Sequence, residues 1–327
     1  MALSTTYDAL LLDLDGTVWE GGKAIPHAVE AIARSGLASV YITNNASRSP
    51  AAVAEMLRAI GLRVDESAVL TSAQAAARLA KQHLADGDAV YVLGTEAFRD
   101  IARAEGLRVV DSADEDPKAV LHGHSTSTGW TELSEAALAI NRGAAYFASN
   151  LDTTLPMQRG LMVGNGSMVA AVTSATGVSP ESAGKPEPEM FLQAASMVGA
   201  SRPLSVGDRL DTDIEGAVAA GIPALHVLTG VSGPLALIEA PKHRRPTFIG
   251  EDMRALGRVA AELRPGQQGG FSARVDGRDI ILSRGNEGAT SIEALRTVLE
   301  VAWLMETPPE LVRPNSDAAE AATSDWW

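Results

Sequence analysis

Four side chains with polar or acidic groups stand at or just beyond the ends of short apolar runs: Asp13, Asp15, Thr43 and Asp208. In open α/β sheets, ligands bind just outside the carboxyl ends of parallel strands. Segments far apart in the sequence can therefore converge there, and we expect these four side chains to share one pocket. The apolar runs, each with the length of a buried strand, are residues 9–12, 40–42 and 204–206.

The carboxylates in these segments are suited to hold a divalent cation. Asp13 and Asp15 are two residues apart, so in an extended chain both side chains point the same way. Two carboxylates that face one space repel each other, and a shared proton or a cation resolves the conflict. Asp208 adds a third carboxylate, and Asp213 follows it about one helical turn later. Three carboxylate oxygens and water suit Mg²⁺, which prefers hard oxygen ligands.

The other polar side chains suit a phosphoryl group, because Thr43 offers a hydroxyl and Lys185 a mobile positive charge. Each segment also has an ordinary structural interpretation. Asp-x-Asp-Gly is typical of a turn or a calcium loop, Thr-Asn-Asn of a capped turn, Gly-Asp of a loop entry, and a lysine before proline is by default solvated. The order of the segments and their place at strand ends favour the functional interpretation.

Apolar runs alternate with helical patterns along residues 9–263, which indicates a parallel sheet covered by helices. Beyond a linker at 264–270, a hairpin turning at Asp276-Gly277 and one more helix are expected. The expected strands are 9–12, 39–42, 89–93, 119–121, 144–148, 203–206, 224–228, 247–249 and the hairpin 271–282. The expected helices are 26–35, 50–60, 72–85, 95–105, 131–142, 166–176, 188–198, 212–220, 251–263 and 291–305.

Composition excludes several classes of protein. The 327 residues, 46% of them hydrophobic, suit two or three domains. The formal net charge of −14 argues against nucleic acid as a partner, since that surface needs a basic patch. The absence of cysteine excludes disulfides, thiolate metal sites and a cysteine nucleophile. Residues 1–12 resemble neither a signal peptide nor a membrane span, so we expect a cytoplasmic protein without a membrane partner.

Four segments together resemble the signature motifs of the haloacid dehalogenase-like superfamily. The resemblance extends over residues 7–263 and is nearest to the NagD-like branch of sugar-phosphate, nitrophenyl-phosphate, phosphoglycolate and glycerol-phosphate phosphatases. It implies an α/β fold in which a Rossmann-like parallel-sheet core carries a large inserted α/β cap domain. The segments are 13–17 (Asp-Leu-Asp-Gly-Thr), 41–45 (Tyr-Ile-Thr-Asn-Asn), 184–186 (Gly-Lys-Pro) and 207–213 (Gly-Asp-Arg-Leu-Asp-Thr-Asp).

The resemblance implies a role for each acidic residue that matches a motif. Asp13 is expected to attack phosphorus and form a phospho-aspartyl intermediate, which divides one hard displacement into two easier ones. Asp15 is expected to protonate the departing alkoxide and then activate water. The cofactor Mg²⁺ is expected on Asp13, the Asp15 backbone carbonyl oxygen and Asp208, with Asp213 supporting these ligands.

The resemblance also implies which residues hold the phosphoryl group. Thr43 and the Asn44 backbone are expected to bind its oxygens, with Asn45 in the same segment, and Lys185 is expected to neutralise charge on the group and on Asp13. The discontinuous catalytic core would comprise residues 1–47 and 183–263. The cap, inserted between the second and third motifs as residues 48–182, would expel water from the phosphate site.

Three cap residues are candidates for contacts with substrate. Asn150 and Asp152 stand near the place where relatives carry a Thr-Asn-x-Asp segment that faces the catalytic pocket. Residues 122–130 depart from the stretches that relatives carry, and this departure motivates the hypothesis that His124 contacts the leaving group. The plainer interpretation of 122–130 is a Ser/Thr loop that caps the next helix. A two-histidine metal site there would have no third ligand nearby.

Residues 265–327 are not explained by the family. The hairpin and helix predict a small C-terminal α+β extension, and its Pro- and Ala-rich tail from 307 is expected to be disordered. An acyltransferase-like fragment is one interpretation, although no phosphate-binding Gly-rich loop accompanies it. An oligomerisation or regulatory appendage is another, and a homodimer is one expected assembly.

The sequence therefore predicts a Mg²⁺-dependent phosphomonoesterase that acts on a small phosphorylated metabolite. Glycerol 3-phosphate is the first expected substrate, with 2-phosphoglycolate or another sugar phosphate as alternatives. A phospho-acceptor signalling module also places Asp, Thr and Lys at strand ends with Mg²⁺, but Asp15 and the cap favour hydrolysis. An inactive binding protein and a phosphotransferase that uses a sugar as acceptor are further alternatives.

Overall fold

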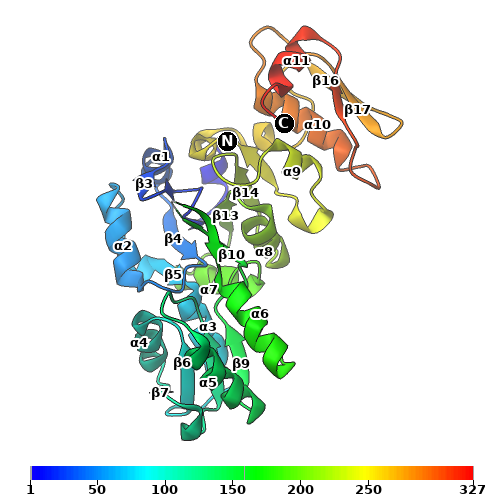
Figure 1. Ribbon diagram of the computed structural model, residues 1–327. Helices are drawn as coiled ribbons and strands as arrows, with labels where there is room; N and C mark the ends of the chain where they lie inside the picture. The colour runs from blue at the N-terminus through cyan, green and yellow to red at the C-terminus, as the bar shows by residue number, and fades with distance from the viewer. Residues whose placement is uncertain (1, 158, 327) are drawn as a thin grey trace. The chain divides into compact units, whose positions relative to one another are not determined.

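The computed structural model describes residues 2–157 and 159–326 (Figure 1). Met1, Gln158 and Trp327, which fall in the predicted core, cap and extension, lie outside the described residues. The chain forms two compact units. Unit 1 comprises Met1–Val40, Ile60–Leu62 and Ala195–Trp327, and unit 2 comprises Tyr41–Ala59 and Arg63–Ala194. Within the described ranges, no helix combines the length and apolar character needed to cross a membrane.

Unit 1 is built on a parallel sheet with the strand order β15-β14-β13-β1. The side chains of β1 are all buried, as expected for a strand covered on both faces. Leu12 pairs with Val206, so the chain leaves β1 and β13 at the same edge of the sheet. The strands are β1 (Ala9–Leu12), β13 (Pro203–Gly207), β14 (Ala224–Val227) and β15 (Phe248–Gly250).

Helices and a small hairpin complete the sheet-bearing part of unit 1. The predicted helix 251–263 is wrong. Two 3-10 helices, η6 (Met253–Gly257) and η7 (Ala260–Leu263), occupy this stretch, because Arg258 and Val259 between them are extended. The other elements are β2 (Trp19–Glu20), β3 (Lys23–Ala24), α1 (Ala28–Ser35), the π-helical turn η4 (Leu210–Ile214), α8 (Glu215–Ala219), α9 (Pro234–Ile238) and the 3-10 turns η1 (Leu3–Thr5) and η5 (Lys242–Arg244).

Unit 2 contains a second parallel sheet, with the strand order β12-β9-β8-β6-β7. Its core is formed by buried side chains such as Tyr91, Val120 and Tyr146. The sheet strands are β6 (Ala89–Leu93), β7 (Arg108–Val110), β8 (Ala119–His122), β9 (Ala145–Ala148) and β12 (Glu181–Ser182). The helices are α2 (Pro50–Ala59), α3 (Ser72–Lys81), α4 (Glu96–Ala104), α5 (Trp130–Asn141), α6 (Asn165–Thr176) and the 3-10 turns η2 (Glu66–Ala68) and η3 (Ala113–Glu115).

The strand β4 and the helix α7 each span a boundary between the units, and three further strands belong to unit 2. The chain passes from unit 1 to unit 2 within β4 (Ala38–Thr43), which pairs in parallel with β5 (Val69–Thr71), and returns within α7 (Pro188–Met197). An antiparallel hairpin, β10 (Thr154–Met157) and β11 (Gly160–Val163), was not predicted from the sequence. The residues of β11 are exposed and apolar, so they lack the alternation that marks a half-buried strand.

The C-terminal extension belongs to unit 1 and has the predicted hairpin and helix. β16 (Phe271–Asp276) pairs antiparallel with β17 (Asp279–Arg284), and α10 (Ser291–Ala302) packs on them. The tail expected to be disordered forms β18 (Val312–Pro314) and α11 (Asp317–Thr323) instead. The Ser316 side chain caps α11, and the indole N–H of buried Trp326 donates to Ser291 Oγ at 2.8 Å. These contacts offset the low apolar content of the tail.

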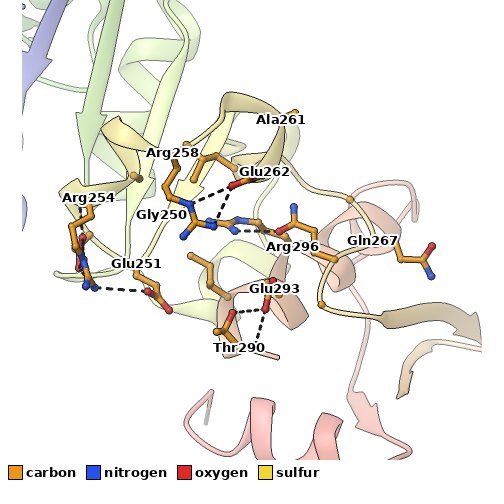
Figure 2. A pocket seen from close by; sticks show the side chains of 17 residues that line it. Gly250, Glu251, Arg254, Arg258, Ala261, Glu262, Gln267, Thr290, Glu293 and Arg296 are labelled. Carbon is orange, nitrogen blue, oxygen red and sulfur yellow. Dashed lines mark hydrogen bonds and ion pairs between the residues drawn. The ribbon is translucent and has the colours of Figure 1, made fainter. Parts of the chain in front are cut away.

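A buried arginine connects the C-terminal extension to the sheet of the same unit by hydrogen bonds. Nε and Nη2 of Arg296 in α10 donate to the Ile249 carbonyl oxygen of β15, at 3.0 and 2.6 Å. Burial lowers the pKa of Arg296 to about 10, which leaves the guanidinium charged at neutral pH. A cavity of about 800 Å³ lies beside Arg296 (Figure 2). All of its lining residues fall between 250 and 296, so it does not include the predicted site residues.

Candidate active site

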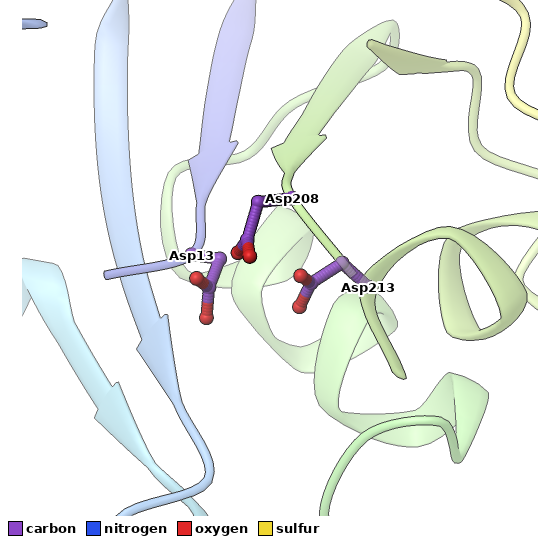
Figure 3. Close-up of side chains that lie close together, drawn as sticks. All are labelled: Asp13, Asp208 and Asp213. Atoms are coloured by element: carbon purple, nitrogen blue, oxygen red, sulfur yellow. The ribbon is translucent and has the colours of Figure 1, made fainter. Parts of the chain in front are cut away.

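Three buried carboxylates come together at one edge of the unit 1 sheet (Figure 3). Asp13 follows β1, Asp208 follows β13, and Asp213 lies in η4. Their nearest oxygens all lie within 4.8 Å of one another, and the three residues are 8%, 0% and 1% exposed. At this spacing, the negative charges of three ionised carboxylates repel one another strongly unless a bound cation offsets them. The donor set consists of hard oxygens and therefore fits Mg²⁺.

Backbone encloses the carboxylate of Asp208 and fixes its orientation. The Val231 N–H donates to Asp208 Oδ2 at 2.7 Å, and the Thr17 hydroxyl donates to Oδ1 at 3.3 Å. Glycine is required on both sides, because a Cβ at Gly16 would lie 2.6 Å from Oδ2 and a Cβ at Gly230 would overlap the same oxygen. Gly16 also adopts a positive φ of 92°, which turns the chain just beyond Asp15.

The turn η4 places the third carboxylate. The Arg209 N–H donates to Asp213 Oδ2 at 3.0 Å, so this side chain closes the turn that it belongs to. Gly207 allows the close packing, because a Cβ there would overlap the Asp213 side chain. The sequence predicted that Asp213 would support the metal ligands. Its distance from Asp13 and Asp208 is compatible with that role and also with direct coordination.

Gly230→Ala is expected to lower the affinity for Mg²⁺ by about 10- to 100-fold, the usual range for disturbing the groups that orient a metal ligand. The new methyl group would force the Asp208 carboxylate away from its present position. Gly233→Ala, in the same loop, is the matched control because a Cβ there meets no atom within 4 Å. The Mg²⁺-dependent rise in Tm measures the affinity without reference to activity. Equal Mg²⁺ responses in both variants would contradict this account of Gly230.

A neutral histidine supports the loop that encloses Asp208. Burial lowers the pKa of His226 to about 4, so the ring is uncharged at neutral pH. Its Nε2 lies 2.9 Å from the Ser232 carbonyl oxygen, which can only accept, and Nε2 therefore carries the hydrogen. The Ser232 N–H in turn donates to the Asp208 backbone oxygen at 3.2 Å. The sequence gave no sign of this support, because His226 lies inside an ordinary apolar strand.

Asp15 is not a member of the acidic group formed by Asp13, Asp208 and Asp213, and its carboxylate accepts a hydrogen bond from a tryptophan. Asp15 is exposed, whereas Trp19 is only 4% exposed. The Trp19 indole N–H donates to Asp15 Oδ1 at 2.8 Å. Sequence reasoning missed Trp19, although one signal was available: a buried indole N–H needs an acceptor, and Asp15 is four residues away.

In unit 2, the side chain of Asn44 joins several predicted site residues. Its Oδ1 accepts from the Lys185 backbone N–H at 2.8 Å, and its Nδ2 donates to the Lys185 carbonyl oxygen at 3.0 Å. Nδ2 also donates to Asp152 Oδ2 at 3.1 Å. Asn150 Nδ2 donates to the Asn44 carbonyl oxygen at 2.7 Å. The structure thus brings Asn44, Asn150, Asp152 and the buried Lys185 together.

The remaining predicted residues of unit 2 are Thr43 at the end of β4, Asn45 in the loop after β4 and His124 in the loop after β8. Thr43 is buried, and its Oγ1 accepts from the Asn45 N–H at 3.1 Å. Asn45 Oδ1 accepts from the Ser47 N–H at 2.8 Å, a turn-forming role that needs no ligand. Ser47 Oγ donates to the His124 backbone oxygen at 3.0 Å and lies 3.4 Å from Nδ1 of its ring. The two loops are therefore linked through Ser47.

Sequence reasoning also missed a buried asparagine that positions the Asn150 segment. Asn165 Nδ2 donates to the Asn150 carbonyl oxygen at 2.8 Å and to that of His122 at 3.4 Å.

Burial lowers the pKa of His122 to about 3, and its Nδ1 pairs with the Tyr146 hydroxyl at 2.8 Å. Among the described residues, no metal-binding group includes either histidine of the 122–130 loop.

Comparisons with known proteins agree with the motifs. The family model described as haloacid dehalogenase-like hydrolase matches residues 10–108, and the HAD-hydrolase-like model matches residues 182–256. A D-glycerol 3-phosphate phosphatase of Mycobacterium tuberculosis is 40% identical over 336 residues, which cover 99% of this chain and 95% of the relative.

Two solved structures are similar to this chain in three dimensions. The glycerol phosphate phosphatase of Mycobacterium tuberculosis in complex with magnesium has a TM-score of 0.94 and 42% identity, with 99% of this chain and 98% of that chain covered. A 4-nitrophenylphosphatase of Thermotoga maritima has a TM-score of 0.73 and 27% identity, with 80% of this chain and 100% of that chain covered.

Proposed function

Because the chain belongs to the haloacid dehalogenase-like hydrolases, in the NagD-like branch, we propose that it is a Mg²⁺-dependent phosphomonoesterase with D-glycerol 3-phosphate as its substrate. The observation that carries this proposal is the buried group of Asp13, Asp208 and Asp213 at neighbouring strand ends. The similarity to a D-glycerol 3-phosphate phosphatase over nearly the whole chain supports the choice of substrate.

Two carboxylates perform the covalent steps in this proposal. In the first step, a carboxylate oxygen of Asp13 bonds to phosphorus as the bond from phosphorus to the substrate alcohol oxygen breaks, and Asp15 gives a proton to that oxygen. In the second step, Asp15 takes a proton from water as the water oxygen bonds to phosphorus. Asp13 leaves as a carboxylate and inorganic phosphate is released.

The acidic group in unit 1 supplies the metal ligands in this proposal. Asp13 and Asp208 would hold Mg²⁺ together with the Asp15 carbonyl oxygen, and Asp213 would support them. Bound there, Mg²⁺ would offset the charge of the carboxylates and of the phosphoryl oxygens. Two hydrogen bonds and two close glycines hold Asp208 in place, so little rearrangement of the protein is needed when the ion binds.

The residues joined by Asn44 would bind the phosphoryl group and the leaving group. We assign the Lys185 ammonium to neutralise phosphoryl charge and the Thr43 hydroxyl to donate to a phosphoryl oxygen. Asn150 and Asp152 would contact the substrate from the predicted cap, residues 48–182. The hydrogen bonds of Asn44 to both backbone groups of Lys185 support this assignment, because they fix the position from which the side chain extends.

A substrate panel tests the choice of substrate. We expect kcat/KM with Mg²⁺ to be higher for D-glycerol 3-phosphate than for 2-phosphoglycolate or p-nitrophenyl phosphate.

His124→Ala should change this ranking of the three substrates, because we propose that His124 contacts the leaving group. His83→Ala, which alters an exposed histidine of the same unit, is the control. A higher value for 2-phosphoglycolate would overturn the choice of substrate, and an unchanged ranking in His124→Ala would remove His124 from the site.

The remaining proposals concern the type of reaction, the location in the cell and the oligomeric state. The relatives described above are phosphatases, which favours hydrolysis over a long-lived phospho-aspartate of a signalling module. We propose a cytoplasmic location and a homodimer. Light scattering on the purified chain measures the assembly, and a monomeric mass would contradict the dimer.

A further inference from the structure

The contact between Trp19 and Asp15 carries an inference beyond the roles given by the motifs. The Trp19 indole N–H lies 2.8 Å from Asp15 Oδ1, the carboxylate oxygen of the proposed acid and base. An indole N–H can only donate, so Oδ1 must act as the acceptor. When Asp15 carries the proton for the leaving group, that proton is therefore favoured on the other oxygen, Oδ2, because the unprotonated oxygen is the better acceptor.

Trp19 is itself held rigidly by the turn that contains Asp15. The Trp19 N–H donates to the Leu14 carbonyl oxygen at 3.0 Å, and the Gly16 N–H donates to the Trp19 carbonyl oxygen at 2.9 Å. Trp19 also begins the hairpin strand β2, in which it pairs with Ala24 of β3. Asp15 lies between the two tied residues Leu14 and Gly16, so the indole and the carboxylate are positioned by one closed segment.

The two side chains differ in burial, and the buried indole can therefore position the exposed carboxylate. Asp15 is exposed, so burial does not fix its side chain, whereas Trp19 is buried. A proton donor that is misplaced by about 1 Å costs on the order of 100-fold in rate. A fixed N–H donor on one oxygen restricts both the position and the plane of the exposed carboxylate.

The ordinary interpretation is that a buried indole N–H needs any acceptor. Two other tryptophans show how the chain meets that need elsewhere. Trp303 donates to the Leu237 carbonyl oxygen at 2.9 Å, and Trp326 donates to Ser291 Oγ at 2.8 Å. Neither acceptor takes part in the proposed reaction. Trp19 instead uses the one carboxylate that must deliver a proton, and the experiment below separates the two interpretations.

We propose that Trp19 is a positioning residue for the acid and base Asp15: its indole N–H holds Oδ1 and presents Oδ2 as the oxygen that exchanges the proton. This inference rests on the proposed phosphatase function. It predicts a dependence on the leaving group. An alkoxide needs a proton as it departs, whereas p-nitrophenolate departs without one. Loss of the indole N–H should therefore lower kcat/KM, which covers the steps up to departure of the leaving group, for the alkoxide substrate alone.

Trp19→Phe removes the N–H and keeps an aromatic ring. We expect kcat/KM for D-glycerol 3-phosphate to fall by about tenfold or more, a part of what general acid catalysis contributes, and that for p-nitrophenyl phosphate to stay within about threefold. Trp303→Phe makes the same chemical change at a backbone acceptor and should leave the ratio of the two values unchanged. Equal losses for both substrates in Trp19→Phe would overturn the proposal, since a purely structural role affects both alike.

Two further measurements guard against a folding defect. Benzothienylalanine placed at position 19 replaces the N–H by sulfur at nearly the same volume, and it should reproduce the selective loss. In an Asp15→Asn background, Trp19→Phe should cause no further loss for D-glycerol 3-phosphate, because residues that act as a unit are not additive. The proposal would be contradicted if the benzothienylalanine variant kept the wild-type ratio of the two kcat/KM values. It would also be contradicted if Trp19→Phe lowered kcat/KM in the Asp15→Asn background as much as it does in the wild type. A wild-type chain that releases phosphate from neither substrate would instead refute the proposed function.

Discussion

Asp13→Asn is expected to lower kcat for D-glycerol 3-phosphate by at least about 10⁴-fold, as removal of a nucleophile does in other enzymes that form covalent intermediates. The amide has neither the charge nor the nucleophilic oxygen of the carboxylate. It also weakens one of the two carboxylate ligands, Asp13 and Asp208, that we propose for Mg²⁺. Release of inorganic phosphate under saturating substrate and Mg²⁺ measures the effect.

Asp8→Asn is the matched control for Asp13→Asn. Asp8 stands just before β1 and Asp13 just after it, so both changes neutralise a carboxylate at an end of the same strand. The Asp8 side chain accepts from the backbone N–H groups of Ser201 and Arg202, and an asparagine oxygen retains an acceptor there. Activity in Asp13→Asn within tenfold of the control would contradict the role of Asp13 as nucleophile.

Asp208→Asn is expected to lower the affinity for Mg²⁺ by more than about 100-fold, since loss of a direct ligand exceeds the 10- to 100-fold cost of disturbing its supports. Asp208 is completely buried and is held at both carboxylate oxygens, so no neighbouring carboxylate can take its position without rearrangement of the loop. The Mg²⁺-dependent rise in Tm should disappear at concentrations that saturate the wild type.

Asp213→Asn provides the comparison that interprets the Asp208 result. We propose that Asp213 supports the ligands rather than joining them, so its loss should fall within 10- to 100-fold. Its Oδ2 accepts from the Arg209 N–H, which also makes it part of the turn η4. A wild-type Mg²⁺ response in Asp208→Asn would contradict the proposed metal site. A larger loss in Asp213→Asn than in Asp208→Asn would exchange the two roles.

The strands that position the site were largely predictable from the sequence. Residues 9–12 and 89–93 form β1 and β6 with the predicted bounds, because a continuous apolar run ends in each case at a polar residue or glycine. The placement of Asp13 and Asp208 follows from the parallel pairing of β1 and β13. The sequence therefore allowed the closeness of Asp13 and Asp208 to be predicted, whereas the place of Asp213 beside them depends on the turn η4.

The supports of the site could not be predicted, because they depend on contacts between segments distant in sequence. The closeness of Gly230 to Asp208 requires a loop that follows β14 to return to the end of β13. Asn165 reaches the Asn150 backbone from the start of α6. Periodicity in one segment carries no information about such contacts.

The predicted helix at 251–263 shows a different limit. Met253, Leu256 and Leu263 are buried, and this spacing suits an α-helix as well as successive 3-10 turns. The Asp252 side chain accepts from the Arg254 N–H and starts the first turn, and the extended residues Arg258 and Val259 then end it. Local capping and backbone geometry, which hydrophobic spacing does not encode, decided the outcome.

Phosphate release by the wild-type chain tests the central claim most directly. The assay uses D-glycerol 3-phosphate with Mg²⁺, then with an excess of a chelator, and then with Mg²⁺ restored. The buried group of Asp13, Asp208 and Asp213 predicts turnover with Mg²⁺, its loss on chelation and its return when the ion is restored. Undiminished phosphate release in the chelator, or none with Mg²⁺ present, would contradict the claim.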